Sequence, residues 1–200
     1  MERQLSPHVA SRWYRSPELI LTERNYGSKS DMWSAGCIFG ECLSFTNAYV
    51  RKGGREIQKR VLFPGSSCFP ISPCQRYEES CDSDTTRISE NDQLIKIFDQ
   101  LGQLDGNDFS FLSDKTAIEY AEQVSSQRKG QTLSKRFSES SSEIVEILEA
   151  LLEFNQQFRV SAKELLKHKI FDDIRVERLE RGAPYQIHLL CDAMDSFNYS

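Results

Sequence analysis

The chain has 200 residues, with 38% hydrophobic and 28% charged side chains and a net charge of −5 at pH 7. This length and balance suit one globular domain, or one lobe of a larger domain. No apolar run approaches the roughly 18 residues of a membrane span, and the N-terminus lacks the apolar core of a secretory signal. We therefore expect a protein of the cytoplasm or nucleus that does not contact membranes.

Basic and cysteine residues give little sign of a nucleic-acid or metal site. The largest basic cluster, residues 51–60, has only Tyr49 as an aromatic neighbour, so we interpret it as a solvated loop that binds no nucleic acid. The six cysteines form no Cys-x-x-Cys pair and have no histidine at a ligand spacing, which argues against a metal site. Cys37 and Cys42 lie in a strongly apolar segment, and we expect both to be buried thiols.

The first predicted helix covers residues 30–43. Its apolar side chains around Trp33 leave almost no polar face, and a helix that is hydrophobic all round is normally buried. We therefore expect this helix at the centre of the core. The stretch that follows, about residues 45–90, contains several Gly, Pro, Ser and Asp residues and is predicted to be an irregular insert.

Apolar stripes of helical period predict two longer helices further along the chain. One covers residues 91–101, with Asn91 or Asp92 as its cap and Gly102 as its end. The other covers residues 142–154.

Capping signals add detail to the C-terminal half. Ser140 and Glu143 have the spacing of a capping box, as do Ser161 and Glu164, which would open a last helix over residues 162–168. Strand-like alternation is absent from the sequence. We therefore expect a mainly α-helical fold.

Three blocks of sequence, in this order, resemble the C-terminal lobe of a eukaryotic protein kinase. Residues 12–18, Arg-Trp-Tyr-Arg-Ser-Pro-Glu, resemble the end of the activation segment. Residues 30–38 resemble the start of the central buried helix, and residues 156–162 resemble the turn before the last conserved helix. Within this family, residues 11–18 and the order of Leu62-Phe63-Pro64-Gly65 and Asp92-Gln93-Leu94 are most similar to the mitogen-activated protein (MAP) kinases, which are CMGC-type Ser/Thr kinases, in an atypical protist-type form.

The resemblance implies a fold and a division of the chain. The fold would be the large C-terminal lobe of the kinase fold, mainly α, truncated and without the β-sheet of the N-terminal lobe. Residues 1–18 would end the activation segment, residues 19–171 would form a partial kinase domain that includes the insert, and residues 172–200 would form a C-terminal tail.

The resemblance also assigns roles to particular residues. The pocket for the substrate residue that follows the phosphoacceptor, which prefers proline in this family, would be formed by Val9, Ala10, Ser11, Arg12 and Arg15. In the family, the hydroxyl at the position of Ser11 contacts the catalytic Asp and Lys.

Four further residues have structural roles by resemblance. Glu18 would pair with Arg159, and Trp33 would lie in the buried helix. Asp31 would hold the backbone of the catalytic loop, although a carboxylate at this place also suits the free N–H groups of a helix N-terminus.

The sequence matches the family pattern less well at the positions that serve regulation and docking. The family carries Thr-x-Tyr before the pocket, whereas this chain has Ser6 as a candidate phosphosite and His8 in place of the tyrosine. A phosphate on Ser6 near the arginines would order the segment. Asp172, Asp173 and Glu177 lie where the family has an acidic docking patch, but they also fit a plain solvated acidic face.

The residues that transfer phosphate are missing from the sequence. It contains no Gly-x-Gly-x-x-Gly, no Val-Ala-Ile-Lys and no His-Arg-Asp, and Asp108-Phe109-Ser110 lies on the wrong side of Glu18 to serve as Asp-Phe-Gly. We therefore expect this chain to bind no cofactor and to be inactive alone, with ATP and Mg²⁺ bound by the complete parent kinase.

Two functional interpretations remain. In the first, the chain is part of a monomeric MAP-kinase-like Ser/Thr kinase with an upstream activating kinase and protein substrates as partners. In the second, it is a non-catalytic lobe that acts as a docking, scaffold or decoy module. A lone lobe would expose apolar surface that normally meets the catalytic loop.

Overall fold

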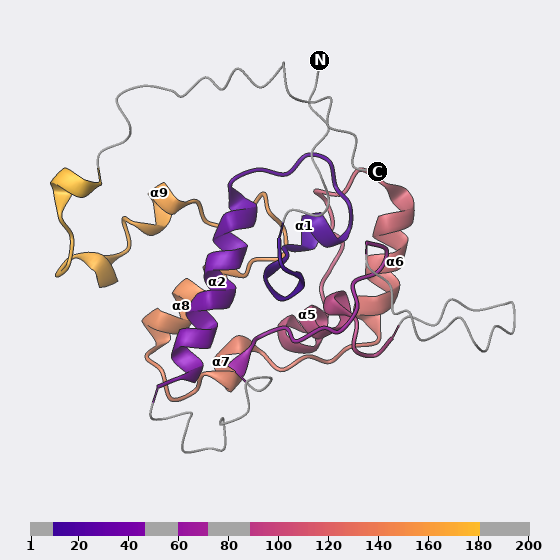
Figure 1. The fold of residues 1–200 in the computed structure, drawn as a ribbon, viewed down its shortest axis with the longest axis horizontal. Coiled ribbons are helices and arrows are strands. Elements are labelled where there is room, and N and C mark those ends of the chain that lie inside the picture. Colours follow the sequence, from indigo (N-terminus) through magenta and orange to yellow (C-terminus); the bar gives the residue numbers. More distant parts are fainter. Residues whose placement is uncertain (1–9, 47–59, 72–88, 181–200) are drawn as a thin grey trace, which may run out of the picture. The chain divides into compact units, whose positions relative to one another are not determined.

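The computed structural model describes residues 10–46, 60–71 and 89–180, without the side chain of Glu177. The chain divides into two compact units, residues 1–167 and 168–200. The described residues are mainly helical and contain no strand, only one isolated parallel bridge between Ser67 and Asp92 (Figure 1). This confirms the predicted mainly α fold without the sheet of the N-terminal lobe.

The helices follow one another with short connections where the chain is described. In the first unit they are η1 (Arg12–Tyr14), α1 (Pro17–Ile20), α2 (Lys29–Ser44), α5 (Gln93–Leu101), α6 (Lys115–Ser126), α7 (Leu133–Arg136), α8 (Ser142–Leu151) and α9 (Ala162–Leu165). The second unit contains the short helices η3 (Lys169–Phe171) and η4 (Glu177–Leu179). Of the described helices, none is both long enough and apolar enough to cross a membrane.

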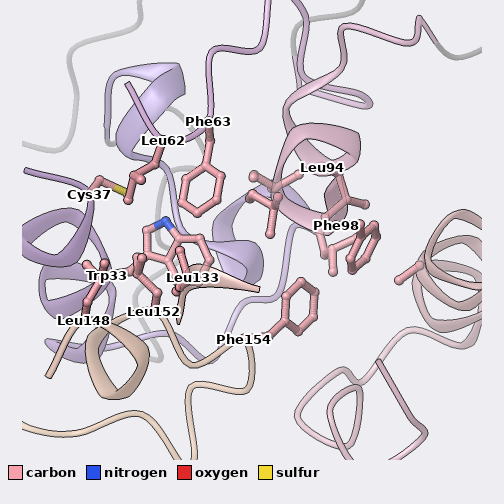
Figure 2. Close-up of a cluster of buried hydrophobic side chains, with 14 of the residues drawn as sticks. Trp33, Cys37, Leu62, Phe63, Leu94, Phe98, Leu133, Leu148, Leu152 and Phe154 are labelled. Carbon is pink, nitrogen blue, oxygen red and sulfur yellow. The ribbon is translucent and has the colours of Figure 1, made fainter. Parts of the chain in front are cut away.

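Helix α2 is the core helix that the sequence predicts. It runs beside α8 (Figure 1), and a Cβ atom on Gly36 would lie only 2.9 Å from the Cβ atom of Leu151, so the glycine allows the two helices to approach closely. Figure 2 shows the Trp33 indole at the centre of the core, with Phe63 and Leu152 around it. The Trp33 and Phe63 rings stack with centroids 5.4 Å apart.

One face of α2 is exposed, which corrects the expectation that this helix is buried all round. Ala35, Ile38, Cys42 and Phe45, spaced by three or four residues, form an exposed α2 stripe, with Ile38 54% and Phe45 56% exposed. Cys37 is buried as expected, and burial raises the pKa of its thiol. Cys42 is exposed, so the expectation of two buried thiols is wrong for it.

Helix α5 begins and ends where its capping residues predict. The carboxylate of Asp92 accepts a hydrogen bond from the Leu94 backbone N–H at 3.1 Å. Gly102 has φ of 90°, and its N–H reaches the Phe98 carbonyl at 2.9 Å, which closes the last turn.

The last two predicted helices are shorter in the structure than in the prediction. α8 ends at Leu151 because the chain then turns Phe154 into the core, where its ring stacks on Phe98 at 5.4 Å. The expected box of Ser140 with Glu143 does not form, since Ser141 is the N-cap and its side chain makes no capping bond.

The Ser161–Glu164 capping box is confirmed. The Glu164 N–H donates to the Ser161 hydroxyl at 3.3 Å, and the Ser161 N–H donates to the Glu164 carboxylate at 2.9 Å. α9 nevertheless ends at Leu165, because His168 takes another role: its Nδ1 accepts from the Ile170 N–H and caps η3.

Candidate functional site

The candidate site is built on residues 10–18, the pocket segment. The backbone N–H of Tyr14 bonds to the Ser11 carbonyl at 3.0 Å to close η1, and Pro17 then stands at the start of α1, where its missing N–H is not needed. Ser6, His8 and Val9 lie outside the described residues. The Ser11 side chain is exposed.

Residues 65–68, which we term the strap, hold the pocket segment through three of its side chains. The guanidinium of Arg12 donates to the Ser66 carbonyl at 2.7 Å, and the indole N–H of Trp13 donates to the Gly65 carbonyl at 2.9 Å. Two further bonds come from Arg15, to the Sγ atom of Cys68 at 3.3 Å and to the Ala10 carbonyl at 3.0 Å. The structure thus brings Arg15 into contact with Ala10 and ties both Arg12 and Arg15 to the strap.

Asp92 fixes the strap to the start of α5. Its Oδ2 atom accepts from the Ser67 hydroxyl at 2.9 Å and from the Phe69 N–H at 2.8 Å, while Oδ1 caps the helix. The Gln93 N–H also donates to the Ser67 carbonyl at 2.9 Å. The sequence predicted Asp92 as one of two candidate helix caps and as part of the kinase-like Asp92-Gln93-Leu94, but it did not predict the bonds to the strap, because a second set of partners leaves no separate mark in the sequence.

The contact between Arg15 and Cys68 joins a charged group to a neutral acceptor. Arg15 is only 6% exposed. Burial raises the pKa of the Cys68 thiol, and the nearby Arg15 charge opposes this only in part. The sulfur therefore remains a protonated acceptor at neutral pH, and its chemistry is that of a packing group rather than a nucleophile.

Adding a methyl group to the strap at Gly65 should loosen this arrangement. In Gly65→Ala, the new Cβ atom would lie 2.7 Å from the Cα atom and 2.8 Å from the N atom of Gln93, which are backbone atoms of α5 and cannot turn away. We expect a loss of about 1–3 kcal/mol of unfolding free energy, as overpacking typically costs. Urea unfolding followed by tryptophan fluorescence measures it.

Gly27→Ala is the matched control, since nothing lies within 4 Å of a Cβ atom at that position. It should stay within about 0.5 kcal/mol of the unsubstituted chain. Equal losses in the two variants would show that the close approach of the strap to α5 carries no stability.

A buried ion pair lies behind the pocket segment. Glu18 and Arg159 are both 0% exposed, and their side chains form two hydrogen bonds, of 2.7 and 3.0 Å, in a fork-to-fork geometry. The hydroxyl of Ser30 adds a third bond to Glu18 at 2.7 Å. The remaining donors of Arg159 reach the carbonyls of Lys29, Glu153 and Phe154.

These partners decide the charge of Glu18. Burial alone would raise the pKa of the Glu18 carboxyl, but the hydrogen bonds and charge of Arg159, with the Ser30 hydroxyl, outweigh burial and lower this pKa below its ordinary value of 4.5. Sequence reasoning missed a second such carboxylate. Glu23 is buried and accepts from the N–H groups of Asn25 at 3.0 Å and Ser113 at 2.8 Å.

Trp33 and Asp31, the other two predicted structural residues, lie in different environments. Trp33 is fully buried, and the guanidinium carbon of Arg159 lies 5.1 Å from its ring centroid. Asp31 lies in the first turn of α2 and is exposed. Its contact with a catalytic loop stays a prediction.

The predicted docking residues lie in the second unit. Asp172 and Asp173 are exposed, and Asp172 lies 3.4 Å from Arg175. The side chain of Glu177 lies outside the described part. A docking role for the three residues therefore stays a prediction.

Comparison with known proteins gives one consistent result. A family model of the protein kinase domain matches residues 1–171. The chain is 30% identical over 164 residues to mitogen-activated protein kinase spk1 of Schizosaccharomyces pombe, an alignment that covers 82% of this chain and 34% of that protein. It is 26% identical over 187 residues to mitogen-activated protein kinase p38a of Drosophila melanogaster, with 94% and 41% covered.

A third relative, mitogen-activated protein kinase 2 of Pneumocystis carinii, is 29% identical over 180 residues, with 90% of this chain and 41% of that protein covered. The chain thus spans 34–41% of the length of these relatives. The kinase-domain match covers most of the chain, and all three relatives are mitogen-activated protein kinases. The chain belongs to the protein kinase family, among the mitogen-activated protein kinases.

Proposed function

We propose that the chain forms the substrate-facing part of a MAP-kinase-like enzyme that transfers the γ-phosphate of ATP to Ser or Thr in cytoplasmic or nuclear signalling. The observation that carries the proposal is the pocket segment itself. Three of its side chains bond to the strap, and the carboxylate of Glu18 at its end pairs with Arg159. A segment held at both places presents a fixed surface to a peptide.

The proposed substrates carry proline after the phosphoacceptor. Arg15 bonds to the Ala10 carbonyl and Arg12 bonds to the strap, which supports the proposal, and the resemblance adds Val9 and Ser11 to the same pocket. The complete kinase should therefore phosphorylate a Ser-Pro peptide in preference to its Ser-Ala counterpart. Equal rates for the two peptides would contradict the assignment of this pocket.

Activation is proposed to come from an upstream kinase acting on Ser6. In the structure Arg15 is buried, whereas Arg12 is only half-buried and already bonds to the strap, so a phosphate on Ser6 would meet a guanidinium group whose position is fixed. Such a phosphate adds charge-assisted bonds to an ordered segment. A docking role for Asp172, Asp173 and Glu177 would give the same kinase a second contact.

The exposed α2 stripe supports the view that more of a kinase domain covers this helix. Ala35, Ile38, Cys42 and Phe45 form an apolar face on the helix that carries the core residue Trp33. Exposed apolar surface of this kind marks a place where other protein packs. We propose that the remainder of the kinase domain packs there.

The residues of this chain do not fit ATP or Mg²⁺. Within the described ranges, no three His, Cys, Asp or Glu side chains lie close enough to hold a metal ion. The 200 residues also lack a glycine-rich loop and a His-Arg-Asp motif. We therefore propose that the chain is inactive alone and acts as a monomer within the larger enzyme.

Two measurements test the proposal. The purified chain should transfer no radiolabelled phosphate to a Ser-Pro peptide, and activity that survives repeated purification would contradict this. The endogenous protein, recovered with an antibody against residues 181–200, should have an intact mass well above 23.1 kDa and contain peptides with the missing motifs.

The second candidate function is a non-catalytic docking, scaffold or decoy module. The exposed carboxylates of Asp172 and Asp173 favour it, because acidic groups attract basic docking peptides. An endogenous species of 23.1 kDa that binds such a peptide would support this function over the first.

A further inference from the structure

Residues 123–138 form a basic segment in a chain that is acidic as a whole. They contain Arg128, Lys129, Lys135 and Arg136 and no Asp or Glu, whereas the net charge of the chain is −5. The segment runs from the last turns of α6 to just past α7, away from the pocket segment and the strap in sequence. Basic side chains placed ahead of a hydroxyl group form a charge pattern that the acidic cleft of a modifying enzyme can recognise.

The two arginines of this segment are used within the fold. Arg128 forms ion pairs with two carboxylates, and Arg136 donates to backbone carbonyls. The side chains of Lys129 and Lys135 are exposed. The lysines are therefore the basic side chains that a second protein can reach without breaking contacts of the fold.

The segment contains five hydroxyl groups, and their surroundings differ. Ser125 is buried, Ser126 donates to a carbonyl within α6, and Ser134 donates to a glutamate carboxylate from within α7. Ser138 is exposed but lies in the turn that follows α7. Thr132 is exposed, and its backbone is extended, with φ of −56° and ψ of 146°. Thr132 is thus the hydroxyl of this segment that is presented on extended backbone.

Lys129 and Thr132 share the loop of residues 128–132, which contains no helix. Gly130 has φ of 56°, a conformation that suits glycine and turns the loop. The Gln131 N–H donates to the Asp99 carbonyl at 2.9 Å, which ties the loop to α5 by its backbone. The side chains of Lys129, Gln131 and Thr132 remain exposed. Recognition of Thr132 from its N-terminal side therefore requires no opening of the core.

We propose that Thr132 is a phosphorylation site for a separate Ser/Thr kinase that recognises a basic side chain three residues before the acceptor. The γ-phosphoryl group of ATP passes to the Oγ1 atom of Thr132, the bond from the γ-phosphorus to the bridging oxygen breaks, ADP leaves and the hydroxyl proton is released. Lys129 supplies the basic side chain. The proposal treats the chain as a substrate, so it does not rest on the function proposed above.

Lys135 gives the new phosphate a partner. Its backbone N–H donates to the Thr132 carbonyl at 3.0 Å, so Lys135 follows Thr132 by one turn, and its side chain is exposed. A phosphate carries about two negative charges and three acceptor oxygens, and the Lys135 ammonium would bond to it.

The test incubates the full 200-residue chain with ATP and a purified Ser/Thr kinase that requires lysine or arginine three residues before its acceptor. Intact mass gives the rate and tandem mass spectrometry gives the position. Ser138 is the internal comparison, because Lys135 precedes it by three residues within α7. We expect Thr132 to react about tenfold faster than Ser138, since presenting Lys135 requires α7 to unfold. Equal rates at the two positions, or no phosphate on Thr132, would overturn the proposal.

Lys129→Gln tests the recognition while leaving the hydroxyl in place. It should slow phosphorylation of Thr132 about tenfold, as the loss of one charge-assisted hydrogen bond allows. Lys115→Gln is the matched control, since it removes the same charge from an 89% exposed side chain of α6 and should leave the rate unchanged. Equal slowing by both variants would mean that net charge sets the rate, and the role assigned to Lys129 would be wrong.

Discussion

Replacing Arg159 with methionine should lower the free energy of unfolding by about 3–5 kcal/mol, because it leaves the Glu18 carboxylate buried without its partner. Methionine fills a similar volume, so the loss comes from the stranded charge more than from a cavity. Both side chains are 0% exposed, so water cannot take the place of the guanidinium. Urea unfolding at neutral pH measures the change.

The double variant Glu18→Gln with Arg159→Met separates the stranded charge from the rest of the site. It removes both charges, and it should recover a large part of the loss. A surface pair is the matched control. Lys115→Met removes the partner of Glu119, 3.7 Å away on exposed α6, and should cost no more than about 0.5 kcal/mol. A similar cost at both sites would refute the role of burial.

The Glu18–Arg159 pair also predicts how the free energy of unfolding changes with pH. The pKa of Glu18 is lowered from 4.5 in the folded chain, so the folded state binds fewer protons than the unfolded state. The contribution of Glu18 to stability is fully present above about pH 4.5 and is lost as the pH falls through the pKa that Glu18 has in the folded chain. The stability advantage of the unsubstituted chain over Glu18→Gln should therefore shrink on acidification below pH 4.5.

Sequence reasoning located the helices that carry their own local signals. α5 has both an apolar stripe and a capping aspartate, and α9 has a complete capping box. α6 was missed because only Ala121 and Ser125 of its residues are buried, which leaves too weak an apolar stripe to detect. α7 is only four residues long.

Contacts between distant segments were not accessible from spacing. The bond between Arg15 and Cys68 joins residues 53 positions apart. The pairing of Glu18 with Arg159, 141 positions apart, followed only from the resemblance to kinases. The exposed face of α2 was unexpected for a different reason. An apolar helix face shows that the face is suited to burial. It does not show whether other residues of this chain are present to cover it.

Trp33→Ala should cost about 3–5 kcal/mol, since it removes the largest fully buried side chain of the core. Trp33→Phe should cost only about 1 kcal/mol, because it keeps the stacking on Phe63 and removes an indole N–H that has no partner within the described residues. Phe158→Ala, at a 66% exposed ring, is the aromatic control and should change stability by less than about 0.5 kcal/mol.

The contact between Trp33 and Arg159 makes these two large effects interdependent. The guanidinium carbon of Arg159 lies 5.1 Å from the centroid of the Trp33 ring. Either substitution therefore removes the same cation–π contact, and its loss is counted twice when the two single costs are added. Combined in one chain, Trp33→Ala and Arg159→Met should cost about 1–2 kcal/mol less than the sum of the single variants. Strict additivity would mean that the cation and the ring do not interact. A measured coupling of this size would show that α2 and the turn before α9 stabilise each other through the buried arginine.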